Sequence, residues 1–264
     1  MTSNPGVLAR IRVGQLPIDV VDFEGALDAI DRLVSAGNGG TVFTPNVDHV
    51  VVAEHDLRFR TAYANVALSL VDGTPVLWAA RLLGTPLPAK ISGSDLVMPL
   101  MRRAADKGYR VYFLGGAEGV ADLARSKLER ELPNLKIVGT DASRISVDSD
   151  PGQVDAVVER IQNARPDLVL VALGAPKQEL WSHSRTQLLS PAVLVGVGAS
   201  LDFVAGIQKR APSWMSKVGM EWLYRLSQEP RRLAGRYLLR DPQFFWILAR
   251  QLVQGSAPRS SQLP

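Results

Sequence analysis

Polar and acidic residues that could do chemistry follow several of the apolar segments that resemble β-strands. The clearest is Asp72, which ends the apolar run 67–71 and is followed by Gly73 and Thr74. A carboxylate at the rim of a sheet is partly desolvated, which raises its pKa and makes it a better general base. The same carboxylate could instead cap the helix expected after Gly73. On spacing alone, the catalytic and the capping role have similar weight.

The ends of other expected strands carry further candidates for binding. Thr44 and Asn46 follow the first core strand, and Gly174, Lys177 and Gln178 follow a later one. In open α/β sheets, ligands bind at the carboxyl ends of the strands. These small and polar residues therefore predict a binding cleft along one edge of a sheet.

Three glycines lie between an expected strand and the next helix. The backbone N–H groups of Gly115, Gly116 and Gly119 could bind a phosphate there. The pattern is GGxxG rather than GxGxxG, and close glycines after a strand are common in α/β proteins. The next strand leads to Asp141, where an acid could bind a ribose. An NAD-dependent oxidoreductase that uses the loop 115–119 therefore stays open as an alternative.

Two further patterns could indicate a metal site. Asp148 and Asp150 form a DxD pattern, but a Pro-Gly pair follows in a polar loop, so a solvated turn is the better interpretation. The three histidines do not have the spacing of metal ligands. We expect no metal site.

The elements that must position these residues alternate along the chain. A hairpin is expected over 11–20, and a helix begins after Asp22 and ends at Gly37. Six apolar runs predict strands, with helix-length segments between them: 41–44, 67–71, 110–114, 135–138, 168–173 and 192–197. This alternation predicts an α/β fold with a Rossmann-like, mostly parallel sheet flanked by helices. Only helices are expected beyond Gly206, at 213–227, 230–239 and 242–254.

The charge is distributed unevenly. From Lys209 onward there are ten Lys and Arg residues against three acids, a net charge of +7, whereas the preceding 208 residues carry −3. Three of the five tryptophans lie in the same C-terminal part. We therefore expect an α/β catalytic core at 1–206, a basic amphipathic helical appendage at 207–254 and a disordered tail at 255–264. The appendage is suited to an anionic membrane surface.

The composition excludes several classes of protein. Cysteine is absent from the 264 residues, so there is no disulfide framework and no thiolate zinc site. The N-terminus lacks the apolar run of a signal peptide, and no uncharged run is long enough for a transmembrane helix. We expect a cytoplasmic protein that is peripheral on the inner face of the cell membrane. We expect no nucleic-acid partner, whereas exposed apolar helices could support a homo-oligomer.

Five blocks, in order along nearly the whole chain, together resemble the WecG/TagA/CpsF glycosyltransferase family. They read TPNVDHVVVAEHD, SLVDGTPVLWAARLLGTPLPAKISGSDL, VYFLGGAEGVADLA, PDLVLVALGAPKQELW and VGVGASLDFVAGIQKRAPSWMSKVGMEWLYRLSQEPRRLAGRYL. The resemblance implies inverting transfer of a sugar from a UDP-sugar to a polyprenyl-diphosphate-linked sugar acceptor, without a metal or other cofactor. It also implies a place in surface polysaccharide biosynthesis, such as teichoic acid linkage units or exopolysaccharides. A non-catalytic nucleotide-sugar sensor is a third possibility.

The resemblance also implies roles for individual residues. Asp72 matches the catalytic base, Thr44 faces the same pocket, and Gln178 positions the donor or acceptor. Arg225, Arg231, Arg232 and Arg236 match arginines of the appendage, which would neutralise the leaving diphosphate. The other residues expected to bind substrate are Asn46, Gly73, Thr74, Gly115, Gly116, Gly174 and Lys177. The segment 141–146 departs from the aromatic-rich pattern of relatives, which leaves the identities of the sugars open.

Overall fold

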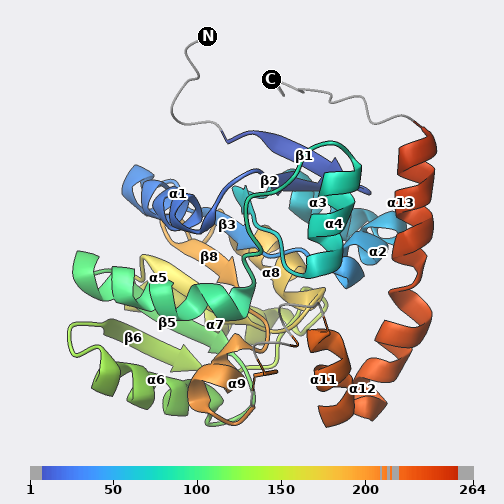
Figure 1. Ribbon diagram of the computed structural model, residues 1–264. Helices are drawn as coiled ribbons and strands as arrows, with labels where there is room; N and C mark the ends of the chain where they lie inside the picture. The colour runs from blue at the N-terminus through green and yellow to red at the C-terminus, as the bar shows by residue number, and fades with distance from the viewer. Residues whose placement is uncertain (1–7, 209, 213–214, 216–219, 255–264) are drawn as a thin grey trace.

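The computed structural model describes residues 8–208, 210–212, 215 and 220–254 (Figure 1). Within these ranges, the side chain of Arg232 is not described. The tail at 255–264, which we expected to be disordered, lies outside the described residues, as does much of the helix expected over 213–227.

A six-stranded parallel sheet forms the centre of the molecule (Figure 1). Its strands lie in the order β4-β3-β8-β7-β5-β6, and every pair is parallel. Their bounds are β3 (Gly40–Phe43), β4 (Leu68–Ser69), β5 (Arg110–Gly115), β6 (Lys136–Asp141), β7 (Leu168–Ala172) and β8 (Val193–Gly196). The predicted α/β fold with a Rossmann-like parallel sheet is confirmed.

The edge strand β4 is shorter than the apolar run 67–71 predicted. Only two of its residues pair in the sheet ladder. The chain nevertheless stays extended beside β3, because the N–H of Leu70 donates to Phe43 O and the N–H of Asp72 donates to Pro45 O. Asp72 is therefore fixed by its backbone at the carboxyl end of this strand.

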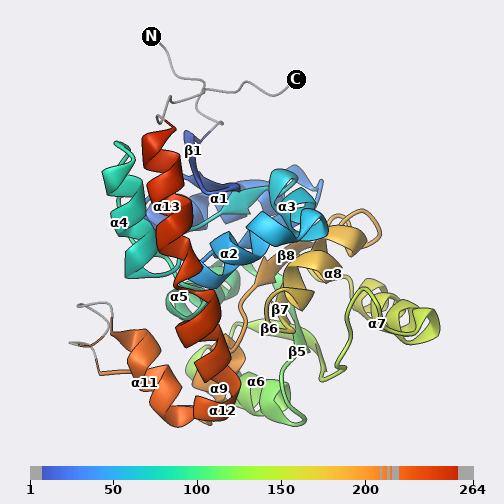
Figure 2. The ribbon, with the colours of Figure 1, turned by 90° about the vertical axis from the view of Figure 1, so that its right-hand side faces the viewer.

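Helices cover both faces of the sheet (Figure 2). One face packs against α1 (Phe23–Ala36), α5 (Gly93–Lys107), α6 (Val120–Glu131) and α9 (Ser200–Ala205). The other packs against α2 (Val47–His55), α3 (Leu57–Ala64), α7 (Pro151–Ala164) and α8 (Lys177–Arg185). Side chains along each strand alternate between the two cores: Val42 enters the first and Phe43 the second.

The N-terminal elements follow the sequence closely. A hairpin of β1 (Arg10–Val13) and β2 (Leu16–Asp19) precedes α1. Asp22 caps α1 by accepting a hydrogen bond from the N–H of Gly25 at 2.8 Å, and Gly37 ends it with a φ of 68°. The predicted hairpin and helix limits are confirmed, since both are set by local turn and cap chemistry.

The described residues beyond Gly206 form helices that run back along the core. They are α11 (Glu221–Gln228), α12 (Pro230–Ala234), the π-helix η1 (Gly235–Arg240) and α13 (Gln243–Val253). The one helix expected over 230–239 is thus α12 continued by η1, where the N–H of Asp241 donates to Arg236 O at 2.8 Å. Phe244 and Ile247 of α13 are buried in one apolar cluster with Val50 of α2. Within the described part of the chain, no helix has the length and apolarity to cross a membrane.

The buried carboxylate of Asp19 ties the hairpin to the edge of the sheet. It accepts hydrogen bonds from Arg10 at 2.7 and 2.9 Å and from the N–H of Ser69 at 2.7 Å. We predict that Asp19→Ala destabilises the protein by about 3 kcal/mol, because it leaves a cation and a backbone donor without their acceptor. Urea unfolding measures the loss. Asp28→Ala, which removes an exposed partner of Arg103, is the control and should cost less than about 1 kcal/mol. Equal losses would contradict the prediction.

Candidate active site

The strand order divides the expected site residues into two groups along the carboxyl edge of the sheet. Asp72 follows β4, Thr44 follows β3 and Gln178 lies beyond β7, so these residues share the half formed by β4, β3, β8 and β7. Gly116 follows β5, four strands from β4. At about 4.8 Å per strand, this separation is roughly 19 Å. The sheet therefore brings Asp72 and Thr44 together on neighbouring strands and places the glycine loop far from Asp72, beside the end of β7.

Asp72 lies half-buried at the end of β4. Burial raises the pKa of its carboxyl to about 6, against the opposing effect of the cations Arg225 and Lys90. Gly73 with a φ of 99° turns the chain, and α4 (Thr74–Leu82) begins without a side-chain cap. The carboxylate of Asp72 therefore does not serve as the helix cap that its sequence position allowed.

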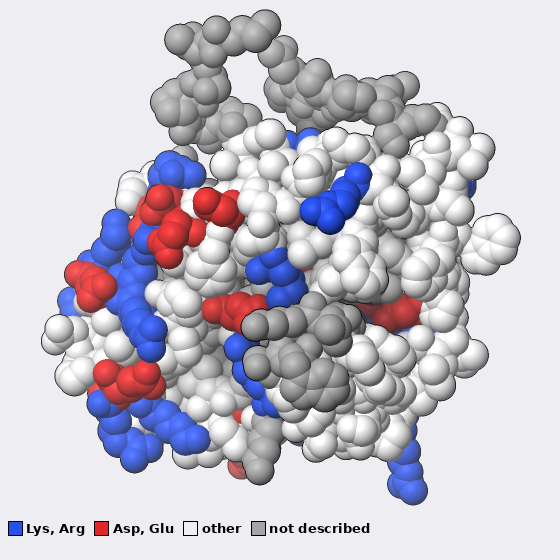
Figure 3. Space-filling view, viewed as in Figure 1, with Lys and Arg blue, Asp and Glu red and all other residues white. Residues whose placement is uncertain are grey.

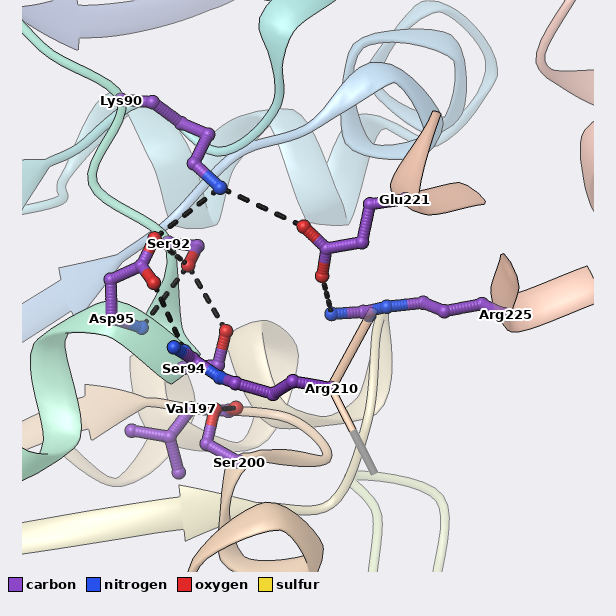
Figure 4. Close-up of polar contacts among 9 residues, drawn as sticks. All are labelled: Lys90, Ser92, Ser94, Asp95, Val197, Ser200, Arg210, Glu221 and Arg225. Carbon is purple, nitrogen blue, oxygen red and sulfur yellow. Dashed lines mark hydrogen bonds and ion pairs between the residues drawn. The ribbon is translucent and has the colours of Figure 1, made fainter. Parts of the chain in front are cut away.

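Five charged residues form a network that we call the charged cluster (Figure 4), and four of them act on the charge of Asp72. Its members are Lys90, Asp95, Arg210, Glu221 and Arg225. Lys90 Nζ lies 3.3 Å from Asp95 and 3.7 Å from Glu221. Arg210 pairs with Asp95 at 3.0 Å, and Arg225 pairs with Glu221 at 2.8 Å. The cluster joins the loop before α5 to helix α11 of the C-terminal part.

Gln178 is buried, and its amide is held at both ends. Its Oε1 accepts from the N–H of Gly198 at 3.0 Å, and its Nε2 donates to Glu179 at 2.6 Å. A Cβ at Gly196 would lie 3.1 Å from Nε2, so the glycine makes room for the amide. Glu179 is fully buried, and desolvation raises the pKa of its carboxyl to about 7 although Gln178 donates to it.

The start of α2 receives arginines from the C-terminal π-helix. Asn46 caps α2 through the N–H of His49 at 3.3 Å, and its Oδ1 also accepts from Arg236 at 3.2 Å. The buried carboxylate of Asp48 lies 2.6 Å from Arg240 Nε and 3.4 Å from Arg236 Nε. Arg236 is therefore brought to the start of α2, where it contacts protein side chains.

A buried histidine lies in the first turn of α2, next to these ion pairs. The ring of His49 lies 2.7 Å from the hydroxyl of Tyr63. Burial, together with Arg236 and Arg240, lowers the pKa of His49 to about 3, so the ring is neutral at physiological pH. In the sequence, His49 lies three residues after Asn46, and this position does not predict that its ring contacts the hydroxyl of Tyr63.

The remaining candidates differ in their accessibility. Thr44 is buried after β3, whereas Thr74 is half-buried at the first turn of α4. Lys177 is exposed at the start of α8, and Gly174 turns the chain before it with a φ of 75°. The backbone of Arg232 lies in α12, but its side chain lies outside the described structure.

The glycine loop and its acidic partner are engaged within the fold. The N–H of Gly116 donates to Ala172 O at 3.1 Å, so one expected phosphate donor is already bound. A Cβ at Gly115 would lie 2.7 Å from the same carbonyl oxygen, which explains the glycine by the close approach of β5 and β7. Asp141 pairs with Arg160 at 2.7 Å.

The DxD pattern serves a structural purpose. Asp150 caps α7 by accepting from the N–H of Gln153 at 3.1 Å, and the exposed Asp148 pairs with Arg58 at 3.1 Å. No group of three or more His, Cys, Asp or Glu among the described residues is arranged to hold a metal ion.

Comparison with known proteins identifies the family of the chain. Residues 11–258 match the glycosyl transferase WecG/TagA/CpsF family. The chain belongs to this family. Among its relatives is the N-acetylglucosaminyldiphosphoundecaprenol N-acetyl-beta-D-mannosaminyltransferase of Bacillus spizizenii, which is 32% identical over 78% of this chain and 77% of its own. The enzyme of the same name from Bacillus subtilis is 34% identical over 74% of this chain and 73% of its own.

Membership of the WecG/TagA/CpsF family identifies the chain as a glycosyltransferase. The resemblance drawn from the five sequence blocks is confirmed. The oxidoreductase alternative has no support, and the acid on which it depended, Asp141, is paired with Arg160.

Several charged residues of this glycosyltransferase site were missed at the sequence level. Lys90 and Asp95 stood in the block that ends ISGSDL, but nothing in that block indicated that Lys90 would pair with Glu221 of α11 or Asp95 with Arg210. Glu179 follows Gln178 in the sequence, and its burial could have been expected from the apolar Leu180 and Trp181 that come next. Asp48 carried no signal for its two arginines, which lie about 190 residues away in the chain.

The buried carboxyl of Glu179 makes the stability of the enzyme depend on pH. Folding raises its pKa from 4.5 to about 7, so the folded protein holds this proton more tightly than the unfolded chain. The resulting stabilisation is complete below pH 4.5 and is lost as the pH rises through 7. We predict that Glu179→Gln, which resembles the protonated form, unfolds at a higher temperature than wild type at pH 8 and at a similar temperature at pH 4.5.

The matched control is Glu129→Gln, which alters a partly exposed pair with Arg125 on α6. It should leave the difference between the two pH values unchanged. Thermal unfolding followed by circular dichroism measures all three proteins. A Glu179→Gln variant that is less stable than wild type at pH 8 would show that the ionised carboxylate is favourable in the fold.

Proposed function

We propose that this glycosyltransferase moves a sugar from a UDP-sugar to a polyprenyl-diphosphate-linked sugar, with Asp72 as the general base. Asp72 accepts the proton of the acceptor hydroxyl, and the oxygen bonds to the anomeric carbon of the donor as the bond to the diphosphate breaks. UDP leaves with the electron pair of that bond. Attack from the side opposite the leaving group inverts the anomeric centre.

The environment of Asp72 is the observation that carries this proposal. A base must be ionised near neutral pH and must hold a proton well enough to remove it from a hydroxyl. Burial raises the pKa of Asp72 to about 6, and the cations Arg225 and Lys90 keep it from rising further. The carboxylate thus meets both requirements.

The cations near Asp72 suit a diphosphate leaving group. Arg225 and Lys90 lie on opposite sides of the charged cluster, one from α11 and one from the core (Figure 4). Positive charge fixed near the breaking bond stabilises the negative charge that develops on UDP. Gln178, with both ends of its amide held, is a rigid group for orienting a substrate.

The relatives support the class of acceptor. The names of both Bacillus enzymes specify an N-acetylglucosaminyl-diphosphoundecaprenol acceptor and an N-acetylmannosaminyl group. We extend the class to this chain as a polyprenyl-diphosphate-linked sugar, and we take UDP-N-acetylmannosamine as the first donor to assay. This chemistry places the enzyme in the synthesis of a cell-surface polysaccharide such as a teichoic acid linkage unit or an exopolysaccharide.

Replacing the base tests the mechanism. We predict that Asp72→Asn lowers the rate of transfer by about 10²-fold or more, because the amide cannot accept the proton. In the wild type, the rate should rise with pH through about 6 as Asp72 loses its proton. Release of UDP in the presence of a lipid-linked acceptor measures both.

Asp148→Asn is the matched control, because it makes the same change in the exposed turn before α7. It should keep the wild-type rate and the wild-type pH profile. Near-normal turnover by Asp72→Asn would exclude Asp72 as the base. Turnover by neither the wild type nor the control with any UDP-sugar would contradict the proposed donor.

We further propose that the C-terminal helices hold the enzyme on the inner face of an anionic cell membrane, where the lipid acceptor lies. The surface over α4 and α13 is largely free of charged side chains (Figure 3). Its exposed side chains include Trp246 at 80%, Phe245 at 68% and Trp78 at 57% of their full exposure. Arg81 of α4 is exposed as well and supplies positive charge for anionic lipids.

Aromatic substitutions test the membrane surface without removing helices that belong to the core. We predict that Phe245→Ala combined with Trp246→Ala weakens binding to vesicles of equal parts phosphatidylcholine and phosphatidylglycerol by about tenfold or more. Sedimentation with the vesicles measures it, and Leu188→Ala, at an exposed site after α8, is the control. Unchanged vesicle binding, with dimers lost in light scattering, would assign the surface to a second copy instead.

A further inference from the structure

The charged cluster neutralises itself in the absence of substrate. Its three cations, Lys90, Arg210 and Arg225, contact the carboxylates of Asp95 and Glu221 at 2.8 to 3.7 Å (Figure 4). Asp72, on which four members of the cluster act, supplies a third negative charge when it is ionised. The place proposed for a diphosphate is therefore already electrically balanced by side chains of the protein.

Of the two carboxylates, Asp95 is fixed to the core. It lies in the first turn of α5, where its Oδ2 accepts from the hydroxyl of Ser92 at 2.6 Å and its N–H donates back at 3.1 Å. Burial opposes its ionisation, but Ser92, Lys90 and Arg210 together hold the pKa of Asp95 below its ordinary value. A ligand that moved this carboxylate would break its hydrogen bond with Ser92, the capping residue of α5.

Among the described residues, the carboxylate of Glu221 contacts only the cations that a diphosphate would bind. Glu221 is the first residue of α11, and its carboxylate contacts Arg225 one turn later and Lys90 of the core. The contact with Lys90 is the longest of the cluster at 3.7 Å. The side chain retains 28% exposure, so it has solvent to turn into.

We infer that Glu221 is a resident counter-ion that gives way to the diphosphate of the donor when the donor binds. This inference rests on the proposed function in placing a diphosphate at the charged cluster. A diphosphate next to Glu221 would bring like charges together, whereas rotation of Glu221 into solvent frees Lys90 and Arg225 for the phosphate oxygens. Glu221 thus stabilises the empty site and lowers the affinity for the nucleotide.

The second contact of Glu221 extends this role to the helix. Through Lys90 it links α11 to the loop before α5, and Arg225 also lies 5.5 Å above the ring of Phe203 in α9. Displacement of Glu221 by the diphosphate would break the link between Glu221 and Lys90 and keep the contact between Arg225 and Phe203. The cation of Arg225 therefore stays in place over Phe203 while its partner changes from a carboxylate to a phosphate.

Binding of UDP to the full-length protein tests the exchange. Calorimetry should show that Glu221→Gln and Glu221→Ala bind UDP about fivefold or more tightly than wild type, because the competing carboxylate is gone. The gain should shrink at high salt, which screens the charges. The control is Glu131→Gln, which removes the same charge beside the exposed Arg102 and should leave the affinity unchanged.

The opposite result has a distinct meaning. If Glu221 served to hold Arg225 ready for substrate, both variants would bind UDP more weakly than wild type, and the exchange would be wrong. Equal affinity in all proteins would also overturn the exchange but would leave the proposed donor intact. Absence of UDP binding by wild type and variants alike would overturn the exchange and the proposed function together. Circular dichroism of each variant shows that the fold is retained.

Discussion

The ion pairs at the buried carboxylate of Asp48 hold the C-terminal helices against the catalytic edge of the sheet. A buried carboxylate without a partner costs several kcal/mol, so Asp48 requires cations close by. Arg240 at 2.6 Å and Arg236 at 3.4 Å supply them, both from η1. Because η1 connects α12 to α13, the pairing of its arginines with Asp48 of α2 positions both of these helices on the core.

Opposing electrostatic effects then set the pKa of each carboxyl at this edge of the sheet. At Asp72, loss of water outweighs the nearby cations, and the pKa rises to about 6. At Asp95, the hydrogen bond from Ser92 and two close cations outweigh burial, and the pKa falls. The charged cluster thus contains a carboxylate, Asp95, suited to remain charged, and it acts on a second carboxylate, Asp72, suited to exchange protons near neutral pH. The difference comes from direct hydrogen bonding, which Asp95 has and which no described residue provides to the carboxylate of Asp72.

The sequence was sufficient for features that depend on neighbouring residues. The cap of Asp22, the stop at Gly37 and the alternation of strands and helices all follow from local patterns, and the structure agrees with them. The link between Lys90 and Glu221 could not be predicted in this way, because the two residues are far apart in the chain and each has an ordinary local context. The order of the strands in the sheet could not be predicted either, because the pattern of apolar residues shows where strands occur but not which strands are neighbours.

Strand order also explains why the two halves of the sheet edge differ in chemistry. In the half that contains β5 and β6, polar groups are satisfied within the fold: the N–H of Gly116 binds Ala172 O, and Asp141 binds Arg160. In the half that contains β4, β3, β8 and β7, the fold leaves Asp72 and Glu179 desolvated with raised pKa values. Such desolvation costs stability, and a fold retains it where a reaction uses the result. The distribution of this cost, more than the number of polar residues, separates the half of the edge that we propose for catalysis from the half whose polar groups are satisfied within the fold.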